Sequence, residues 1–300
     1  MFSKVLIGID GGDGGLDALA LGRSLAAADG ELVLAHIWEP AAGIVAAATG
    51  EPHPARLAEE LLGAAARGLT GPYRTIARPA ASPGAGLHAL AEQFGCDLLV
   101  VGSASAQRTG RVHLTRDVRM ALHGAPCAVA VAPAGHRTAG RDIERVGLGF
   151  EETDLCEQAL VSARGLAAGL GAELWVETVV PLVPSAWFGG PFTYLALFDD
   201  IAGRTVEEAR ERLEARGGFK VSIARGAAAP SLLEFSSRVD LLVLGSRSYG
   251  PARRMLLGST SDAVVRDAAC PVLILPLPVL AETEAHEAAA ASEPVAAGGS

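Results

Sequence analysis

The sequence lacks an extended cluster of Lys and Arg, and its formal net charge at pH 7 is -9 over 300 residues. Binding of nucleic acid requires basic side chains that gather on one surface and neutralise phosphates. The pair Arg253-Arg254 comes nearest to such a cluster, and a solvated helix face is sufficient to explain it. The composition therefore argues against a nucleic-acid partner.

Cysteine is also scarce. Cys96, Cys127, Cys156 and Cys270 form no CxxC pair and have no nearby histidine at metal-ligand spacing. A zinc site and a disulfide framework are both disfavoured, and we expect no bound metal held by these residues. Small buried core residues in a reducing, cytoplasmic protein explain the pattern better.

No unbroken hydrophobic run has the length of a membrane span. The apolar run at residues 5–9 is too short for a signal peptide. The uncharged stretch 179–198 is nearly long enough, but three prolines and two glycines interrupt it. We expect a loop there and no membrane partner. Its aromatic residues could cover a ligand site, face a protein partner or pack on their own domain.

What the sequence does contain is an internal repeat. Residues 97–103 read Asp-Leu-Leu-Val-Val-Gly-Ser, and residues 240–246 read Asp-Leu-Leu-Val-Leu-Gly-Ser. Gly102 and Gly245 are 143 residues apart, as are Cys127 and Cys270. The chain is therefore a tandem duplication, with expected domains at 1–138 and 143–278. The tail 279–300 is rich in Ala, Glu, Pro and Gly, and we expect it to be disordered.

Within each half, short β-rich runs alternate with helical patterns, which is typical of parallel βαβ units. The pattern predicts an α/β fold of two repeated doubly wound domains, each a five-stranded parallel sheet flanked by helices. Strands are expected at 4–9, 31–38, 73–77, 98–102, 128–132, 145–149, 173–180, 220–224, 241–245 and 272–275. Helices are expected at 16–28, 54–67, 86–94, 115–122, 154–170, 199–216, 231–237 and 259–268.

Ligands of open parallel sheets bind beyond the carboxyl ends of the strands. In the second half, the loop that leaves the sheet at Gly245 returns at Gly258 to a helix that begins Ser259-Thr260-Ser261. Glycines allow close backbone approach, and free amides at a helix N-terminus bind phosphate. An N-cap with turn glycines and no ligand explains the same residues, so the loop alone leaves both readings open.

The order of elements, the strand-end Leu-Gly-Ser and the strand Cys-Pro-Val-Leu-Ile-Leu at 270–275 resemble the universal stress protein family. The resemblance covers residues 1–135 and 143–278 and implies an adenine-nucleotide-alpha-hydrolase-like fold. ATP-binding members carry Gly, two residues, Gly, nine residues, then Gly and Ser or Thr. Here Gly245, Ser248 and Gly258-Ser259 take those places, so that one glycine is replaced by serine.

The two halves depart from the family pattern differently. The family usually has an acidic residue after the first strand, near the adenosine end of the nucleotide. The first half keeps this residue as Asp10 but loses two loop glycines, and a Cβ at Thr115 would obstruct a phosphate, although Arg116 could supply charge. The second half keeps the loop and has Glu151 instead. The resemblance thus implies a site for ATP or another adenine nucleotide in the second half: Glu151, Val179, Gly245, Arg247, Ser248, Gly258, Ser259 and Thr260.

Position 179 and its first-half counterpart, Ile37, match a family position beside the adenine, although both could be ordinary core residues. Asp10 and Asp13 could hold Mg²⁺ or could simply form a turn. The sequence contains no Gly-x-Ser-x-Gly elbow, no Walker lysine and no His-Glu-x-x-His motif. We therefore expect a stress-response regulator that binds ATP, is not an enzyme, and at most hydrolyses ATP slowly.

The rival expectation is a nucleotide-free interaction module, which Ser248 and Glu151 favour. Family members commonly dimerise through the last strand of the sheet. The resemblance therefore implies an intramolecular pseudo-dimer in which 128–132 pairs with 272–275, covering an edge that would otherwise be exposed. Association of two chains into a homodimer stays open.

Overall fold

The computed structural model describes residues 1–103, 110–112, 116–140, 142–181, 193–249 and 254–278. In the N-terminal half, five parallel strands lie in the order β3-β2-β1-β4-β5. Their bounds are β1 (Phe2–Gly8), β2 (Ala26–Trp38), β3 (Tyr73–Pro79), β4 (Leu98–Gly102) and β5 (Ala128–Ala132). The helices of this half are α1 (Asp13–Leu25), α2 (Pro40–Thr49), α3 (Pro54–Ala65), α4 (Pro83–Phe94), α5 (Arg116–Leu122) and α6 (His136–Ala139).

The C-terminal half repeats this arrangement with parallel strands in the order β11-β9-β6-β7-β8. The strands are β6 (Arg145–Phe150), β7 (Glu173–Val180), β8 (Lys220–Arg225), β9 (Leu241–Tyr249) and β11 (Val272–Pro278), with the short β10 (Arg254–Leu256) beside β9. The helices are α7 (Asp154–Leu170), α8 (Thr193–Arg216), α9 (Ala228–Phe235) and α10 (Ser259–Asp267). Both halves have the doubly wound α/β architecture that the pattern predicts.

Alternate strand residues face two separate helix layers, because successive side chains of a strand point to opposite faces. Val5 and Ile7 belong to a core with residues of α1, α3 and α7, whereas Leu6 belongs to a core with residues of α4, α5, α9 and α10. Local signals set helix ends: Ser82 Oγ accepts the Ala85 amide at the start of α4, and Gly95 ends that helix at φ +61°.

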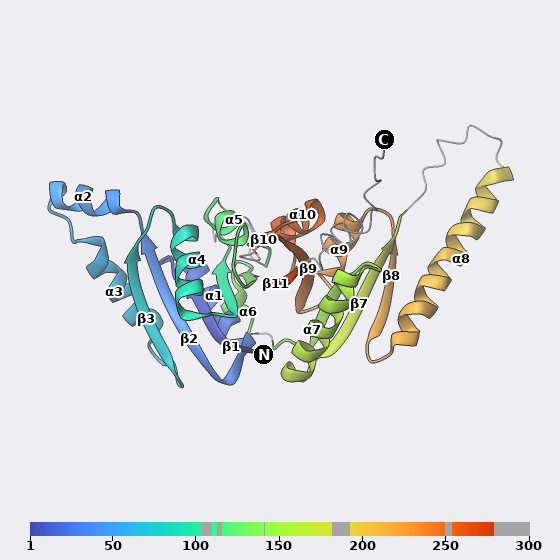
Figure 1. Cartoon of the computed structure of the whole chain (residues 1–300), viewed down its shortest axis with the longest axis horizontal. Coiled ribbons are helices and arrows are strands. Elements are labelled where there is room, and N and C mark those ends of the chain that lie inside the picture. The colour runs from blue at the N-terminus through green and yellow to red at the C-terminus, as the bar shows by residue number, and fades with distance from the viewer. Residues whose placement is uncertain (104–109, 113–115, 141, 182–192, 250–253, 279–300) are drawn as a thin grey trace, which may run out of the picture.

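The two halves share one sheet, because β5 and β11 pair antiparallel at its centre (Figure 1). Val272 lies opposite Val131, and Ile274 lies opposite Val129. The paired segments lie within 128–132 and 272–275, the two ranges for which the family resemblance implied pairing. The edge strands of the joined sheet are β3 and β8, on opposite sides of the molecule, with α2 and α3 beyond β3 and α8 beyond β8 (Figure 1).

The repeated aspartate at the start of each motif has the same structural task in both halves. Asp97 accepts the amides of Ser3 (2.7 Å) and Lys4 (2.9 Å). Its counterpart Asp240 accepts the amides of Glu144 (3.3 Å) and Arg145 (2.9 Å) and also binds the Arg145 guanidinium. Each aspartate therefore fixes the start of the first strand of its half to the start of the fourth.

Several expected bounds differ from the structure, and three of the differences bear on the argument. The first helix ends at Leu25 rather than at residue 28, because residues 26–28 already belong to β2. The strand expected to end at Gly245 continues to Tyr249, because β10 and the end of β11 both supply pairing partners. The stretch 179–198 is not one loop: it begins in β7 and ends in α8, and residues 182–192 lie outside the described part.

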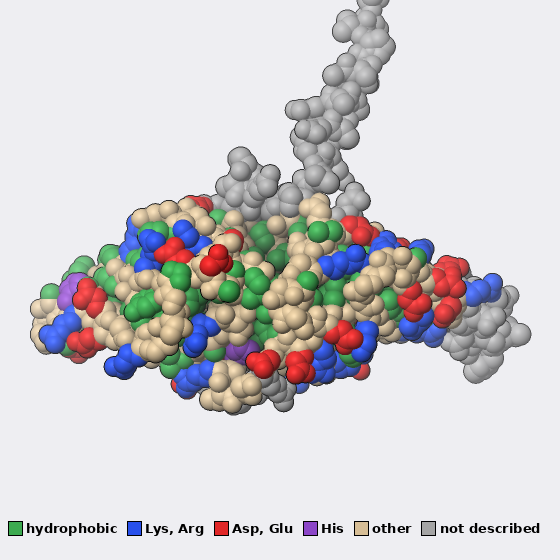
Figure 2. Space-filling model, turned by 90° about the horizontal axis from the view of Figure 1, so that it is seen from below, with side chains coloured by type: hydrophobic (Ala, Val, Ile, Leu, Met, Phe, Trp, Pro, Cys, Tyr) green, Lys and Arg blue, Asp and Glu red, His purple; other side chains and the backbone are tan. Residues whose placement is uncertain are grey.

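Within the described ranges, no helix combines the length and the apolar character that a membrane span requires. Figure 2 shows Lys and Arg side chains interspersed with Asp and Glu over the lower face of the molecule. No broad surface of one sign is visible in this view, in keeping with the absence of a basic cluster from the sequence.

Candidate functional site

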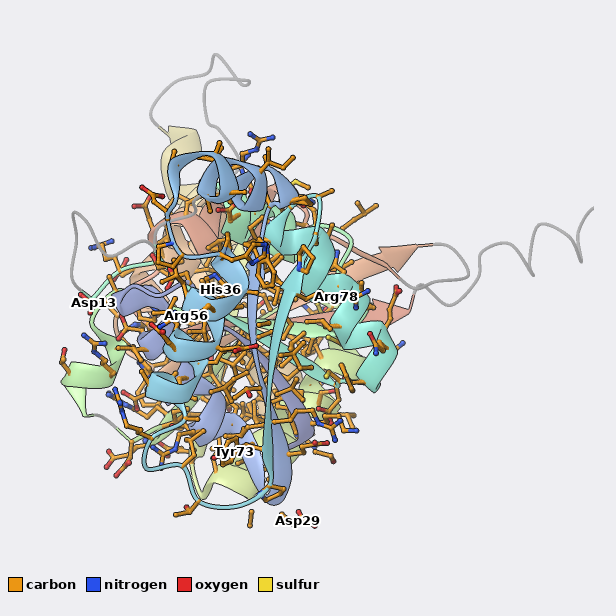
Figure 3. The ribbon with its side chains drawn as sticks, turned by 90° about the vertical axis from the view of Figure 1, so that its left-hand side faces the viewer. Asp13, Asp29, His36, Arg56, Tyr73 and Arg78 are labelled. Carbon is orange, nitrogen blue, oxygen red and sulfur yellow. The ribbon has the colours of Figure 1, made fainter. Side chains whose placement is uncertain are left out.

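A pocket of about 360 Å³ opens at the carboxyl ends of β1, β2 and β4 in the N-terminal half. This is the edge at which open parallel sheets bind ligands. Figure 3 shows Asp13 and His36 toward this end, with Asp29 and Tyr73 at the opposite end of the same half. The volume lies in the range of small-molecule sites. The pocket is therefore the candidate ligand site of this half.

The walls of the pocket are mostly apolar. Ala35 and Ile37 come from the end of β2, Val101 from β4, and Leu87 and Val118 from α4 and α5. Gly8 forms part of the floor, where a built Cβ would lie 3.4 Å from Leu87 and 3.6 Å from Val101. Such walls suit a flat, largely apolar ring.

Asp10 stands on the rim of the pocket, just after β1. Its Oδ1 accepts the amides of Gly12 (2.9 Å) and Gly15 (3.0 Å), so the carboxylate caps the start of α1. Among the described residues Oδ2 has no hydrogen-bond donor, and it can accept a hydroxyl from a ligand. Asp13 instead forms an ion pair with Arg137. Both aspartates therefore take structural roles in this turn.

His36 adds a polar group to the pocket. Its Nδ1 lies 2.6 Å from the carbonyl oxygen of Ile9. A carbonyl oxygen only accepts, so Nδ1 is the donor in this bond. The described lining residues offer carboxylate acceptors around an apolar hollow, and they include no Cys, Ser, Thr or Lys that could act as a nucleophile.

In the N-terminal half, close backbone contact explains Gly102. A Cβ built on Gly102 would lie 1.8 Å from the carbonyl oxygen of Gly14, so α1 can pack against β4 only if this position is glycine. Residues 104–109 and 113–115, which include Thr115, lie outside the described ranges. Arg116 begins α5 and is exposed.

The residues expected to form a site in the C-terminal half lie along the same edge of its sheet. Glu151 follows β6 and is exposed, and Val179 is half-buried near the end of β7. Gly245, Arg247 and Ser248 are all within β9, whereas a loop was expected for the last two. A Cβ on Gly245 would lie 2.7 Å from Cδ1 of Leu277, so packing of a core side chain explains this glycine.

The other three expected residues form the start of α10. Gly258 is its N-cap at φ -72°, without a side-chain cap and without any atom within 4 Å of a built Cβ. Ser259 is exposed and Thr260 half-buried in the first turn. The structure thus leaves these helix amides open to an anion, but residues 250–253 of the preceding loop are not described.

Comparison with known proteins decides the family. The model of the universal stress protein family matches residues 1–133 and again residues 142–276. The chain belongs to the universal stress protein family. It is similar to a universal stress protein of Mycobacterium tuberculosis, with 27% identity over 231 residues, 74% of this chain and 78% of that protein. A Thermus aquaticus universal stress protein is 30% identical over 137 residues, covering 43% of this chain and 95% of that protein.

Solved structures agree on the fold of this universal stress protein. A universal stress protein from Archaeoglobus fulgidus has a TM-score of 0.60 at 18% identity, with 91% of this chain and 98% of that chain covered. A functionally unknown protein from Pseudomonas aeruginosa has a TM-score of 0.61 at 18% identity, with 91% and 92% covered. The tandem arrangement and the fold class predicted from the sequence are confirmed.

The halves of this universal stress protein differ in size and charge at Ala35 and its counterpart Glu177. Ala35 lies between Gly8 and Ile76 in the sheet, and Glu177 lies between Gly149 and Ser222 at the equivalent place. The side chain of Glu177 is fully buried, and its Oε2 accepts from Ser222 (3.0 Å) and Arg238 (2.5 Å). Burial raises the pKa of this carboxyl.

The space beside Glu177 is also narrower than its N-terminal counterpart. A Cβ built on Gly149 would lie 2.9 Å from Leu244 and 3.0 Å from Leu232, closer than the 3.4 Å and 3.6 Å found at Gly8. Leu244 takes the place of Val101 and adds a methylene. A bulky buried carboxylate and a larger side chain therefore occupy the region that forms the pocket in the N-terminal half.

Sequence reasoning missed the lining residues Gly8, Ala35, Val101 and Asp117, because it compared the halves only by their glycine loops and by the acidic residue after the first strand. One signal was present. A charged residue, Glu177, stands inside the expected strand 173–180, where the repeat-equivalent position of the first half is alanine. Alignment of the two second strands would have shown which half keeps an apolar wall.

Proposed function

We propose that this universal stress protein is a regulatory protein that binds an adenine nucleoside or nucleotide in the pocket of its N-terminal half. The observation that carries the proposal is that Asp10 and Ile37 line one pocket. These are the two positions at which the family resemblance implies the ribose and the adenine. The apolar walls suit the base, and Oδ2 of Asp10 can accept from a ribose hydroxyl.

The assignment of ATP to the C-terminal half, through Glu151, Val179, Gly245, Arg247, Ser248, Gly258, Ser259 and Thr260, stays a prediction. The open surroundings of Gly258 favour it. Glu177 and Leu244 speak against it, because they narrow the place of the base. We therefore rank the C-terminal half second.

Calorimetric titration with adenosine and with ATP tests the proposal. Ala35→Leu fills the N-terminal pocket from the wall, and we expect it to abolish binding of the adenine ligand. Gly258→Val is the matched variant of the other half; its φ and free surroundings accommodate a side chain. We expect Gly258→Val to bind normally, with thermal denaturation confirming that both variants fold.

The reverse result, loss of binding in Gly258→Val and retention in Ala35→Leu, would assign the site to the C-terminal half. Absence of any adenine ligand from the wild-type protein, both in titration and in mass spectrometry of the purified chain, would favour the rival function of a ligand-free interaction module. We expect no conversion of ATP to ADP at a rate above that of the Ala35→Leu variant.

We further propose that the pairing of β5 with β11 takes the place of a dimer contact between separate chains, with the two domains at 1–138 and 143–278. The main-chain amides of Gly135 and Arg137 donate to the carboxylate of Asp17; these bonds hold the end of the first domain on α1 and support this boundary. Light scattering should give a mass near 30.6 kDa. A mass twice as large would show that chains associate further.

A further inference from the structure

We propose that the N-terminal pocket selects adenosine or an adenosine derivative without a charged phosphate chain, and that Asp117 is the residue that disfavours ATP. The inference deepens the proposed function and depends on it. It concerns which member of the adenine ligand class the pocket takes.

The ionisable groups around the pocket are unsuited to a polyphosphate. Among the described lining residues these groups are Asp10, His36 and Asp117. Two carboxylates from different elements thus face the same hollow, one from the turn after β1 and one from the first turn of α5. Both carboxylates are exposed, so a polyphosphate in this hollow would meet a like-charged rim whose repulsion is screened by salt.

The described lining of this pocket contains no arginine. Arg78, which lies opposite Ile37 in the sheet, donates through Nη1 to Oε1 of Gln93. Arg111 donates through Nη1 to the carbonyl oxygen of Asp267, in the other half of the molecule. Arg137 pairs with Asp13, outside the pocket lining. Arg116 is exposed and does not belong to the pocket lining, although it directly precedes Asp117.

Comparison of the two halves shows which residue of the C-terminal half corresponds to Asp117. Asp117 is 143 residues before Thr260, the hydroxyl residue in the first turn of α10. A hydroxyl can donate to a phosphate oxygen, whereas a carboxylate only accepts. Asp117 also lies in the first turn of α5, where its own charge already complements the helix dipole that would attract an anion.

The adenosine part of the ligand encounters none of this repulsion. Ribose hydroxyls donate to carboxylates, so Oδ2 of Asp10 favours the sugar. The apolar walls from β2, α4 and α5 surround the base. The same two carboxylates that oppose phosphate groups are thus compatible with a nucleoside whose 5′ end is neutral or positively charged.

The test is a titration series with adenosine, AMP and ATP in low salt without Mg²⁺. We expect adenosine to bind at least about tenfold more tightly than ATP. Asp117→Asn removes the charge at nearly constant size, and should reduce this preference at least about tenfold. Asp117→Glu restores the charge and should restore the preference. Glu59→Gln on the exposed face of α3 makes the same change in net charge and should leave the preference as it is.

The salt dependence of the affinity distinguishes a charge effect of Asp117 from a purely structural role, which would not depend on salt. Raising NaCl from about 0.05 to 0.5 M screens repulsion, so the affinity of the wild type for ATP should rise while that for adenosine stays level. In Asp117→Asn the rise should shrink.

Tighter binding of ATP than of adenosine in the wild type, or an unchanged preference in Asp117→Asn, would overturn the inference and leave the proposed function intact. If neither adenosine nor ATP binds, the proposed function fails, and the inference fails with it.

Discussion

The amide of Val112 in the N-terminal half donates to the carbonyl oxygen of Ala268 in the C-terminal half at 2.9 Å. The same bond recurs in reverse 143 residues away, where the amide of Met255 donates to the carbonyl oxygen of Ala125 at 3.1 Å. Gly124 returns a bond to Met255 at 2.9 Å. Each half therefore forms main-chain hydrogen bonds with the segment that follows the fourth strand of the other half, beside the pairing of β5 with β11.

From these reciprocal hydrogen bonds between the halves we expect the two halves to unfold together. Met255 is fully buried, and its truncation in Met255→Ala should lower the free energy of unfolding by about 2–5 kcal/mol. Hydrogen exchange at the Val112 amide should accelerate as well, although it lies in the other half. Leu256→Ala changes the next residue, which is about half exposed, and should cost about 0.5 kcal/mol or less. Protection of Val112 that is unchanged in Met255→Ala would contradict the coupling.

Asp17 predicts how the connection between the halves is held. Its buried carboxylate accepts the amides of Gly135 (2.7 Å) and Arg137 (2.9 Å) at the start of α6. Asp17→Ala leaves both amides without this acceptor and should cost about 2–4 kcal/mol. Trypsin should then cleave after Arg137 much faster. The exposed ion pair makes Asp13→Ala a milder control, at about 1 kcal/mol or less. Equal cleavage rates in the wild type and Asp17→Ala would refute this role.

Glu177 predicts a pH dependence of stability. Burial raises the pKa of its carboxyl in the folded state, so the neutral form favours folding. Its contribution is therefore complete below the pKa of an unfolded glutamate and is lost as pH rises through the folded pKa. Relative to Glu177→Gln, the wild type should become less stable from acid to neutral pH. Urea unfolding at a series of pH values measures this.

The matched control for that series is Glu59→Gln, at an exposed glutamate of α3 whose charge does not act on Glu177. Its difference from the wild type should stay flat with pH. A Glu177→Gln difference that is equally flat, or that shrinks toward neutral pH, would show that Glu177 is not destabilised by its ionisation. The Oε1 atom of Glu177 has no partner among the described residues, which is consistent with the expected direction.

Thiol reactivity should distinguish one cysteine from the other three. Cys96, Cys127 and Cys270 are buried as expected, whereas Cys156 is only half-buried. Burial raises the pKa of Cys96 to about 11 and that of Cys127 to about 12, which keeps both as unreactive thiols near neutral pH. A disulfide reagent should label one thiol rapidly in the native protein and none in Cys156→Ser. Rapid labelling of several thiols would contradict this burial.

Because the sequence repeats, most of the fold could be predicted from it. Buried runs such as Leu98–Gly102 and Ala128–Ala132 were placed with the bounds that the structure has, because continuous apolar stretches mark strands covered on both faces. The added length of β9 was not accessible, since Arg247 and Ser248 carry no strand pattern. They are strand residues because β10 and β11 bind them from both sides.

The candidate site was less accessible than the fold, for a physical reason. A glycine loop is visible as a local motif, whereas a pocket depends on side chains from several distant elements. Gly245 fits a phosphate motif, yet its closest neighbour is the side chain of Leu277. Ala35 fits no motif, yet its small size leaves room for the pocket. Local spacing could not rank the halves, but comparison of Ala35 with Glu177 could.

The two halves belong to one chain and pair through β5 and β11, and this has a consequence for how their sequences can come to differ. Two separate chains with different sequences would sort into a mixture of like and unlike pairs. A single polypeptide makes every pair unlike, in fixed one-to-one proportion. Equivalent positions such as Asp117 and Thr260, or Ala35 and Glu177, can therefore differ between the halves. The interface between the halves does not have to select unlike halves over like ones.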